Sequence, residues 1–143
     1  METISRFSGD YAFLSNFCSS LIVMDNQQYS TVEHAYQAAK TTDMALRAEF
    51  TAPLVFLSSR KAKRMGRLLP LRPDWEAIKD SVMLELLRAK FQLPYLRASL
   101  LRTGDAYLVE GNTWGDTYWG VCNGVGLNKL GILLMQVRDE IRG

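Results

Sequence analysis

Apolar residues recur at helical spacing in several stretches of the chain, and the clearest begins after Pro73-Asp74. Its hydrophobic positions are Trp75, Ile78, Val82, Leu86 and Ala89. Steps of three and four residues place side chains on one face of an α-helix. Proline is common in the first turn of a helix. The pattern therefore predicts a long helix opened by Pro73-Asp74 that packs this face into the core.

A second helix is predicted just after residue 30. Ser30 and Glu33 have the spacing of a capping box, in which a serine side chain caps the helix and a glutamate three residues later reaches back to the cap. We expect this helix to run to about Thr41. Its apolar stripe consists of Val32, Ala35, Tyr36 and Ala39.

Shorter helical segments fill much of the remaining chain. Glycine commonly ends a helix, because it adopts the left-handed conformation without strain. The predicted segments are about Asp43 to Phe50, a helix with Pro53 in its first turn that ends at Gly66, a turn or helix from Pro94 that Thr103-Gly104 closes, and a final helix from roughly Leu127 to Arg142.

β-structure is predicted only in small pieces. The first thirty residues are aromatic and β-prone, and we expect two short strands there, with a turn at Asp25-Asn26-Gln27. Tyr107-Leu108-Val109 has the pattern of a buried strand. The chain lacks the strand–helix alternation of a Rossmann fold. We therefore predict an α+β, predominantly helical single domain over residues 1–143 with a few short strands.

The composition narrows the classes of function. The length of 143 residues suits one ordinary domain, and the net charge of +2 argues against a dedicated duplex-binding protein. No apolar run approaches the ~20 residues of a membrane span, and the N-terminus lacks the layout of a signal peptide. One histidine and two cysteines, Cys18 and Cys122, cannot form a structural zinc site. We expect a small, cytoplasmic, metal-independent domain.

Residues 31–40 (TVEHAYQAAK) form the first candidate site. Glu33, Gln37 and Lys40 lie at positions i, i+4 and i+7 and share one helix face. The backbones of Glu33 and Lys40 are then roughly 10 Å apart, which leaves room for a substrate between their head groups. The helix dipole keeps a carboxylate in the first turn ionised, and this favours a nucleophilic or charge-stabilising role for Glu33. Alternatively, Glu33 only completes the cap and Lys40 is a solvated lysine.

A glycine-rich segment forms the second candidate site. Residues 111–126 contain five of the ten glycines and two of the three tryptophans. Glycines let a backbone approach a ligand closely, and a loop that leads into a helix offers N–H groups to anions. Trp114 and Trp119 beside Asp116 suit a wall for stacking on a nucleobase. The alternative is a turn whose tryptophans fill the core.

Residues 60–67 (RKAKRMGR) are the only basic cluster. Such runs are usually solvated helix faces. The alternative is a phosphate anchor, since arginine binds phosphate through paired hydrogen bonds. His34 is expected to be a hydrogen-bonded structural residue rather than a catalyst.

Eight segments together resemble the YbiA-like, or NADAR, family, and they follow the family's order over nearly the whole chain. They are YAFLSNF (11–17), TVEHAYQAAK (31–40), AKRMGR (62–67), RPDW (72–75), AKF (89–91), LLRTG (100–104), DTYWG (116–120) and NKLGILLMQVR (128–138). The resemblance implies a YbiA-like fold. It also implies an N-glycosidase that cleaves the bond between ribose C1′ and an amine nitrogen and needs no cofactor.

The resemblance also implies roles for individual residues. The functional positions of the family correspond here to Glu33, Trp75 and Asp116, with Lys40 as a further candidate. Trp75 would stack on the base. The residues expected to hold phosphate are Lys63, Arg64 and Arg67, and those expected to complete the substrate-binding set are Asn16, Trp119 and Asn128.

Cleavage of an N-ribosyl bond develops positive charge at C1′ and requires a proton on the leaving amine. We hypothesise that Glu33 faces the ribose and that Asp116 acts from the opposite side. If the bond is to an exocyclic amine, the sugar can open to an imine. Lys40 could then attack to give a Schiff base, provided that its surroundings lower its pKa.

The resemblance leaves two substrate classes. We prefer the phosphoribosylamino-pyrimidine intermediates of riboflavin synthesis. The alternative is ADP-ribose attached to guanine, so nucleic acid would be a partner only as the carrier of a modified guanine. A non-catalytic ADP-ribose or nucleotide-binding module is a third interpretation. Glu33 and Asp116 argue against it, because a pure binder gains little from carboxylates beside a phosphorylated ligand.

Overall fold

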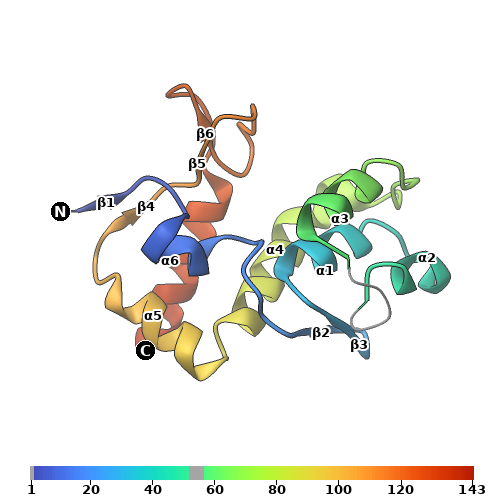
Figure 1. The fold of residues 1–143 in the computed structure, drawn as a ribbon, viewed down its shortest axis with the longest axis horizontal. Helices are drawn as coiled ribbons and strands as arrows, with labels where there is room; N and C mark the ends of the chain where they lie inside the picture. Colours follow the sequence, from blue (N-terminus) through green and yellow to red (C-terminus); the bar gives the residue numbers. More distant parts are fainter. Residues whose placement is uncertain (1, 52–56) are drawn as a thin grey trace. The chain divides into compact units, whose positions relative to one another are not determined.

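The computed structural model describes residues 2–51 and 57–143, which form two compact units. One unit combines residues 1–15 with residues 91–143, and the other comprises residues 16–90. Helices predominate in both, and the strands are only two or three residues long (Figure 1). This confirms the predicted α+β, mostly helical fold class.

The unit of residues 16–90 begins with a β-hairpin. Strand β2 (Ile22–Met24) pairs antiparallel with β3 (Gln27–Tyr29), with Ile22 opposite Tyr29. Asp25 and Asn26 connect the strands with φ values of 49° and 64°. A two-residue type I′ turn requires this left-handed pair. The predicted turn is confirmed, and both Ile22 and Tyr29 are fully buried.

Helix α1 (Val32–Ala38) follows the hairpin, and its cap differs from the prediction. Thr31 caps the helix in place of Ser30, because its Oγ1 accepts a hydrogen bond from the backbone N–H of His34 at 3.2 Å. Glu33 is therefore at the second helical position, one short of the capping-box position. Its own N–H donates to the backbone carbonyl of Asn16 at 3.1 Å. The helix ends at Ala38, before the expected Thr41.

Two short helices come next. Helix α2 (Met44–Ala48) is capped by Asp43 within the predicted segment and ends before Phe50. Helix α3 (Ser59–Gly66) is capped by Ser58 and ends at the predicted Gly66. It begins later than expected, and the Pro53 assigned to its first turn lies outside the described residues.

Helix α4 (Trp75–Lys90) is the predicted long helix, but its buried face is broader than the expected stripe. Ile78, Val82 and Ala89 are only half-buried. Both α1 and β2 pack against α4, so side chains between the expected positions become buried as well. The buried residues are Trp75, Met83, Leu86, Leu87 and Lys90.

The other unit joins the two ends of the chain. Strand β1 (Thr3–Ile4) pairs in parallel with β4 (Tyr107–Leu108), and β5 (Gly111–Asn112) pairs in parallel with β6 (Val121–Cys122). Helices α5 (Pro94–Arg102) and α6 (Lys129–Arg142) pack against each other (Figure 1). The helix that Pro94 opens is thus confirmed, and the last helix begins two residues after the expected Leu127.

Two details of this unit correct the sequence-based expectations. The aromatic residues near the N-terminus form a 3-10 helix, η1 (Gly9–Leu14), because Gly9 turns the chain with a φ of 58°. In the strand at 107–108, Leu108 is fully buried but Tyr107 is 43% exposed, since successive side chains of a strand point to opposite faces. Along the described residues, no helix combines the length and apolar character required to cross a membrane.

Candidate active site

The residues predicted for the site divide between the two units. Asp116, Trp119 and Asn128 belong to the unit of residues 1–15 and 91–143. The others belong to residues 16–90: Asn16, Glu33, Lys40, Lys63, Arg64, Arg67 and Trp75. The convergence of Glu33 and Asp116 on one sugar carbon therefore stays a prediction, and each group is described within its own unit.

Glu33 is a buried carboxylate on α1. It is 7% exposed. Because Thr31 caps the helix, Glu33 lies one position before the one that a capping box requires, so the alternative that it only completes the cap is wrong. Its Oε1 accepts a hydrogen bond of 2.8 Å from Nε2 of Gln37, one turn further along the helix. Charged groups are buried at a cost unless they are hydrogen-bonded, and Gln37 supplies one such bond.

Lys40 lies just beyond the end of α1, so only Glu33 and Gln37 of the predicted shared face belong to the helix. Lys40 is half-buried, and its Nζ lies over the ring of Tyr36 at 5.8 Å from the centroid. Within the described part of the chain, Lys40 makes no ion pair at 4 Å or less.

The pKa of Lys40 is lowered from its ordinary value. Burial is the largest cause, because it disfavours the ammonium, and the negative charge of Glu33 opposes it. Three further cations lower the pKa as well: Arg67, Lys63 and Lys79. A lysine with a lowered pKa carries more of the neutral, nucleophilic amine at neutral pH.

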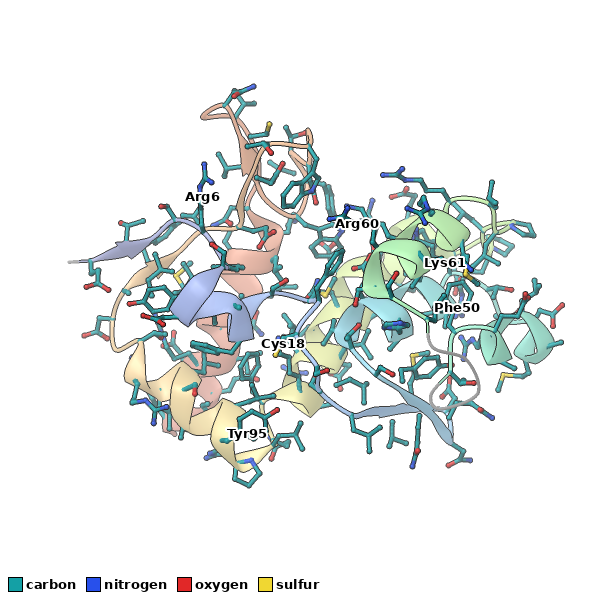
Figure 2. All side chains as sticks on the ribbon, in the orientation of Figure 1. Arg6, Cys18, Phe50, Arg60, Lys61 and Tyr95 are labelled. Atoms are coloured by element: carbon teal, nitrogen blue, oxygen red, sulfur yellow. The ribbon has the colours of Figure 1, made fainter. Side chains whose placement is uncertain are left out.

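The basic cluster on α3 has two faces. Ala62 and Gly66 form the buried face of the helix. Lys63 and Arg67, one position further along, are the two cations of this segment whose charges act on Lys40. Arg60, Lys61, Arg64 and Arg67 are exposed and Lys63 is half-buried, and Figure 2 shows Arg60 and Lys61 on α3. The role of Lys63, Arg64 and Arg67 in holding phosphate stays a prediction.

Lys79 is a cation near Lys40 that the sequence interpretation missed. It lies on α4, and its Nζ pairs with Oε2 of Glu76 at 2.5 Å. Its side chain is 17% exposed. Its position one helical turn after Trp75 is the signal that could have found it, since residues four apart share a helix face.

Trp75 opens α4 and is 4% exposed. Its indole packs against Tyr36 of α1, with ring centroids 5.1 Å apart and planes tilted by 57°. A buried ring contact of this kind is typical of a residue in the hydrophobic core. Stacking of Trp75 on a substrate base stays a prediction.

Asn16 supports the start of α1. Its backbone carbonyl accepts a hydrogen bond from the Glu33 N–H, and its Nδ2 lies 3.6 Å from Sδ of Met83. Its Oδ1 is buried and has no hydrogen-bond partner among the described residues. An unpaired buried oxygen next to the backbone of Glu33 is suited to accept a hydrogen bond from a ligand.

Asp116 lies in a loop that side-chain-to-backbone hydrogen bonds hold in place. Asn112 accepts from the N–H of Asp116 at 3.0 Å and donates to its carbonyl at 2.8 Å. Oδ1 of Asp116 accepts from the N–H groups of Tyr118 at 3.1 Å and Trp119 at 2.9 Å. The sequence interpretation did not single out Asn112, although asparagine typically forms such local bonds in turns.

The two tryptophans of this loop differ in exposure. Trp114 is 61% exposed, so the alternative that both tryptophans fill the core is wrong for this residue. Trp119 is half-buried, and its ring meets that of Tyr118 edge-on at a centroid distance of 5.0 Å. A role of Trp119 in stacking on a base stays a prediction.

Asn128 connects the start of α6 to the segment after β4. It adopts a left-handed conformation with a φ of 54°. Its Nδ2 donates to the carbonyl of Leu108 at 2.9 Å, and its Oδ1 accepts from the N–H of Glu110 at 3.0 Å. Both ends of the carboxamide thus have partners within the protein. Its predicted contact with substrate remains untested.

Comparisons with known proteins agree on one family. The model of the NADAR domain matches residues 5–142. The chain is 44% identical to the N-glycosidase YbiA of Shigella boydii, over 98% of this chain and 89% of that protein. It is 36% identical to a riboflavin biosynthesis protein of Vibrio vulnificus, over 93% of this chain and 36% of that protein. The NMR structure of Escherichia coli YbiA matches with a TM-score of 0.84 and 41% identity, over 99% of this chain and 87% of that one.

Proposed function

Because this chain belongs to the NADAR domain family, we propose that it is an N-glycosidase that hydrolyses the bond between ribose C1′ and an amine nitrogen. A relative named N-glycosidase matches 98% of the chain. The observation that carries the proposal is a carboxylate on α1 and a lysine just beyond the end of that helix. Glu33 is buried, and Lys40, on which the charge of Glu33 acts, has a pKa lowered by burial.

In the hydrolysis, the C1′–N bond breaks with its electron pair moving to nitrogen, and a water oxygen bonds to C1′. Positive charge develops at C1′ during this step. Glu33 stabilises that charge as a carboxylate, and its burial strengthens the interaction, because a low dielectric screens it less. Asp116 delivers the proton to the leaving amine or orients the water. The bonds from Asn112 and from the loop N–H groups fix the aspartate's position, which supports its role in orienting the water.

Lys40 offers a second route when the leaving group is an exocyclic amine. The sugar opens to an imine, the neutral Lys40 amine adds to C1′, and the base departs as its amine. Water then hydrolyses the resulting Schiff base and releases the sugar and the free lysine. The lowered pKa of Lys40 supports this route, because only the unprotonated amine attacks.

The substrate that we favour is a phosphoribosylamino-pyrimidine, an intermediate of riboflavin synthesis. The relative from Vibrio vulnificus is named a riboflavin biosynthesis protein. A single 5′-phosphate suits the cations around Lys40, which are Lys63 on α3, Arg67 directly after α3, and Lys79 on α4. The net charge of +2 is small for a protein that grips long stretches of nucleic acid.

The test is to incubate the protein with the phosphoribosylamino-pyrimidine and, separately, with DNA that carries ADP-ribosylated guanine. We expect ribose 5-phosphate from the first and no ADP-ribose from the second. Glu33→Gln should lower the rate by at least about 100-fold, while the same change at the exposed Glu85 should leave it unaltered.

Turnover by Glu33→Gln at the parental rate would refute the assignment of Glu33. Release of ADP-ribose instead of ribose 5-phosphate would transfer the activity to the other substrate class. Borohydride added during turnover separates the two routes. A reduced adduct on Lys40 indicates the Schiff base, whereas an active Lys40→Ala variant without any adduct leaves only the carboxylate route.

A further inference from the structure

Gln37 is a buried amide with no role in the chemistry described so far. It lies near the middle of α1 and is 4% exposed. Its Nε2 donates to Oε1 of Glu33 at 2.8 Å, one helical turn away. A carboxylate oxygen only accepts hydrogen bonds when ionised, so the NH₂ end of this amide must face Glu33.

The other end of the amide lies against Gly66, where α3 packs on α1. A Cβ built on Gly66 would lie only 1.8 Å from Oε1 of Gln37 and 2.6 Å from its Cδ. The amide therefore fills the space that any side chain at position 66 would need. Glycine at the end of α3 leaves the space that the Gln37 amide occupies, and the bond to Glu33 sets which end of the amide faces that carboxylate.

This arrangement is costly for packing alone. Oε1 of Gln37 is buried and has no hydrogen-bond partner among the described residues. Burying an unpaired carbonyl costs free energy, and an apolar side chain of the same length would avoid that cost. What an apolar side chain could not supply is the donor to Glu33.

We infer that Gln37 is a positioning residue for Glu33, which fixes one oxygen of the carboxylate and favours its ionised form. The inference rests on the proposed glycosidase function, in which Glu33 acts as a carboxylate at C1′. A donor to the charged form of an acid makes that form more stable. Loss of Gln37 should therefore weaken the reaction step more than substrate binding.

Other charges also bear on the ionisation of Glu33. Lys40 lies just beyond the end of α1, and the charge of Glu33 acts on its pKa. The other charges that act on Lys40 are those of Lys63 on α3, Arg67 directly after α3, and Lys79 on α4. These cations favour the carboxylate form of Glu33 in every variant of position 37. A difference in Glu33 titration between the parent and such a variant therefore reports the effect of Gln37 alone.

The decisive variant is Gln37→Met, which keeps the length of the side chain and removes the donor. The matched control is Gln136→Met on α6, because Gln136 makes the same bond to a glutamate four residues later, Glu140, at 3.3 Å on the surface. For Gln37→Met we expect kcat to fall about tenfold with KM changed less than about twofold, and the acidic limb of the pH–rate profile to move up by about one pH unit.

A second readout does not depend on turnover. The ¹³C chemical shift of the Glu33 carboxyl, followed against pH, should show a higher midpoint in Gln37→Met than in the parent and in Gln136→Met. If the parent releases no sugar from either substrate, the proposed function fails, while this titration still decides the role of Gln37. An unchanged midpoint together with an unchanged kcat overturns the inference.

Gln37→Glu provides the test if Gln37→Met does not fold. The new carboxyl has the same size and donates to Glu33 only while it is protonated. We expect activity that declines as the pH rises, at a pH where the parent is still fully active. A variant whose profile matches the parent's would contradict the inference.

Discussion

Two hydrogen bonds define the protonation state of His34. Its Nε2 lies 2.7 Å from the carbonyl of Leu57, which only accepts, so the proton is on Nε2. Nδ1 then accepts from the hydroxyl of Thr31 at 2.7 Å. The side chain is buried at the start of α1, which confirms the predicted structural role. The same two bonds link the cap of α1 to the segment before α3.

We predict that His34 makes stability depend on pH. Burial lowers its pKa below 6.5, so between 6.5 and the lowered value the unfolded chain binds a proton that the folded chain does not. The contribution is complete above pH 6.5 and is lost as the pH falls below it, by at most about 1.4 kcal/mol per pH unit.

The measurement is the free energy of unfolding in urea from pH 7.5 to 5.5, for the parent and for His34→Gln. His34 is the only histidine, so the two curves should approach each other as the pH falls. Parallel curves would show that His34 titrates alike in both states.

Among the elements, α1 and α3 pack closely because α3 ends in a glycine. The closest approach is between Gly66 and the side chain of Gln37, where even a methyl group has no space. The sequence predicted where both helices lie and that Gly66 ends one of them. Its second role, as a contact surface for α1, follows only from how the helices are packed.

We predict that Gly66→Ala lowers the free energy of unfolding by about 1–3 kcal/mol, because the new methyl group must displace the Gln37 amide. Helix propensity alone would favour alanine by about 1 kcal/mol. In a Gln37→Ala background the obstacle is removed, so the same substitution should be neutral or stabilising. A double-mutant cycle in urea measures this, and additive effects would contradict the packing argument.

For the molecule as a whole, the two units are interleaved in the sequence. The chain leaves the first unit after residue 15 and returns to it at residue 91. Its N-terminal strand β1 pairs with β4, through bonds from the N–H groups of Tyr107 and Val109 to the carbonyls of Glu2 at 2.8 Å and Ile4 at 2.9 Å. The first residues of the chain therefore complete a unit built mainly from its last third.

We predict that Ile4→Ala destabilises the protein by about 2–5 kcal/mol, because Ile4 is 4% exposed and its removal leaves a cavity. Thr3→Ala, at the exposed neighbouring position of the same strand, should stay within about 0.5 kcal/mol of the parent. Urea unfolding of the two variants checks both values. Equal effects would mean that β1 contributes no core packing.

Predictions succeeded where neighbouring residues set the structure and failed where distant residues set it. The turn at Asp25-Asn26 and the start of α5 at Pro94 were predicted correctly, because φ preferences act within a few residues. The cap of α1 was assigned to Ser30 instead of its neighbour Thr31, since both hydroxyls suit a cap and only the chain's path selects one. Strand β1 was missed, because its partner lies about one hundred residues away.

In the candidate site, too, the features set by neighbouring residues were predictable and those set by helix packing were not. Glu33 and Gln37 lie one turn apart on α1, as helical periodicity predicts, whereas Lys40 lies beyond the end of the helix. The cations near Lys40, and the glycine against which Gln37 packs, come from segments more distant in the chain. Which of these residues come close to Glu33, Gln37 and Lys40 depends on how the helices pack.

By itself, the sequence determined the helices, the hairpin turn, the family and the two acids and one lysine expected to act. The helices and the turn rest on spacing and backbone preference, which are properties of neighbouring residues. The family and the roles expected of the acids come from the resemblance of eight segments to that family. Only the tertiary structure decided that Glu33 is buried and hydrogen-bonded to Gln37, and that burial and nearby cations lower the pKa of Lys40. It also decided that residues 1–15 join residues 91–143 in one unit. Burial, electric field and strand pairing all depend on segments distant in the chain, so local pattern does not contain them.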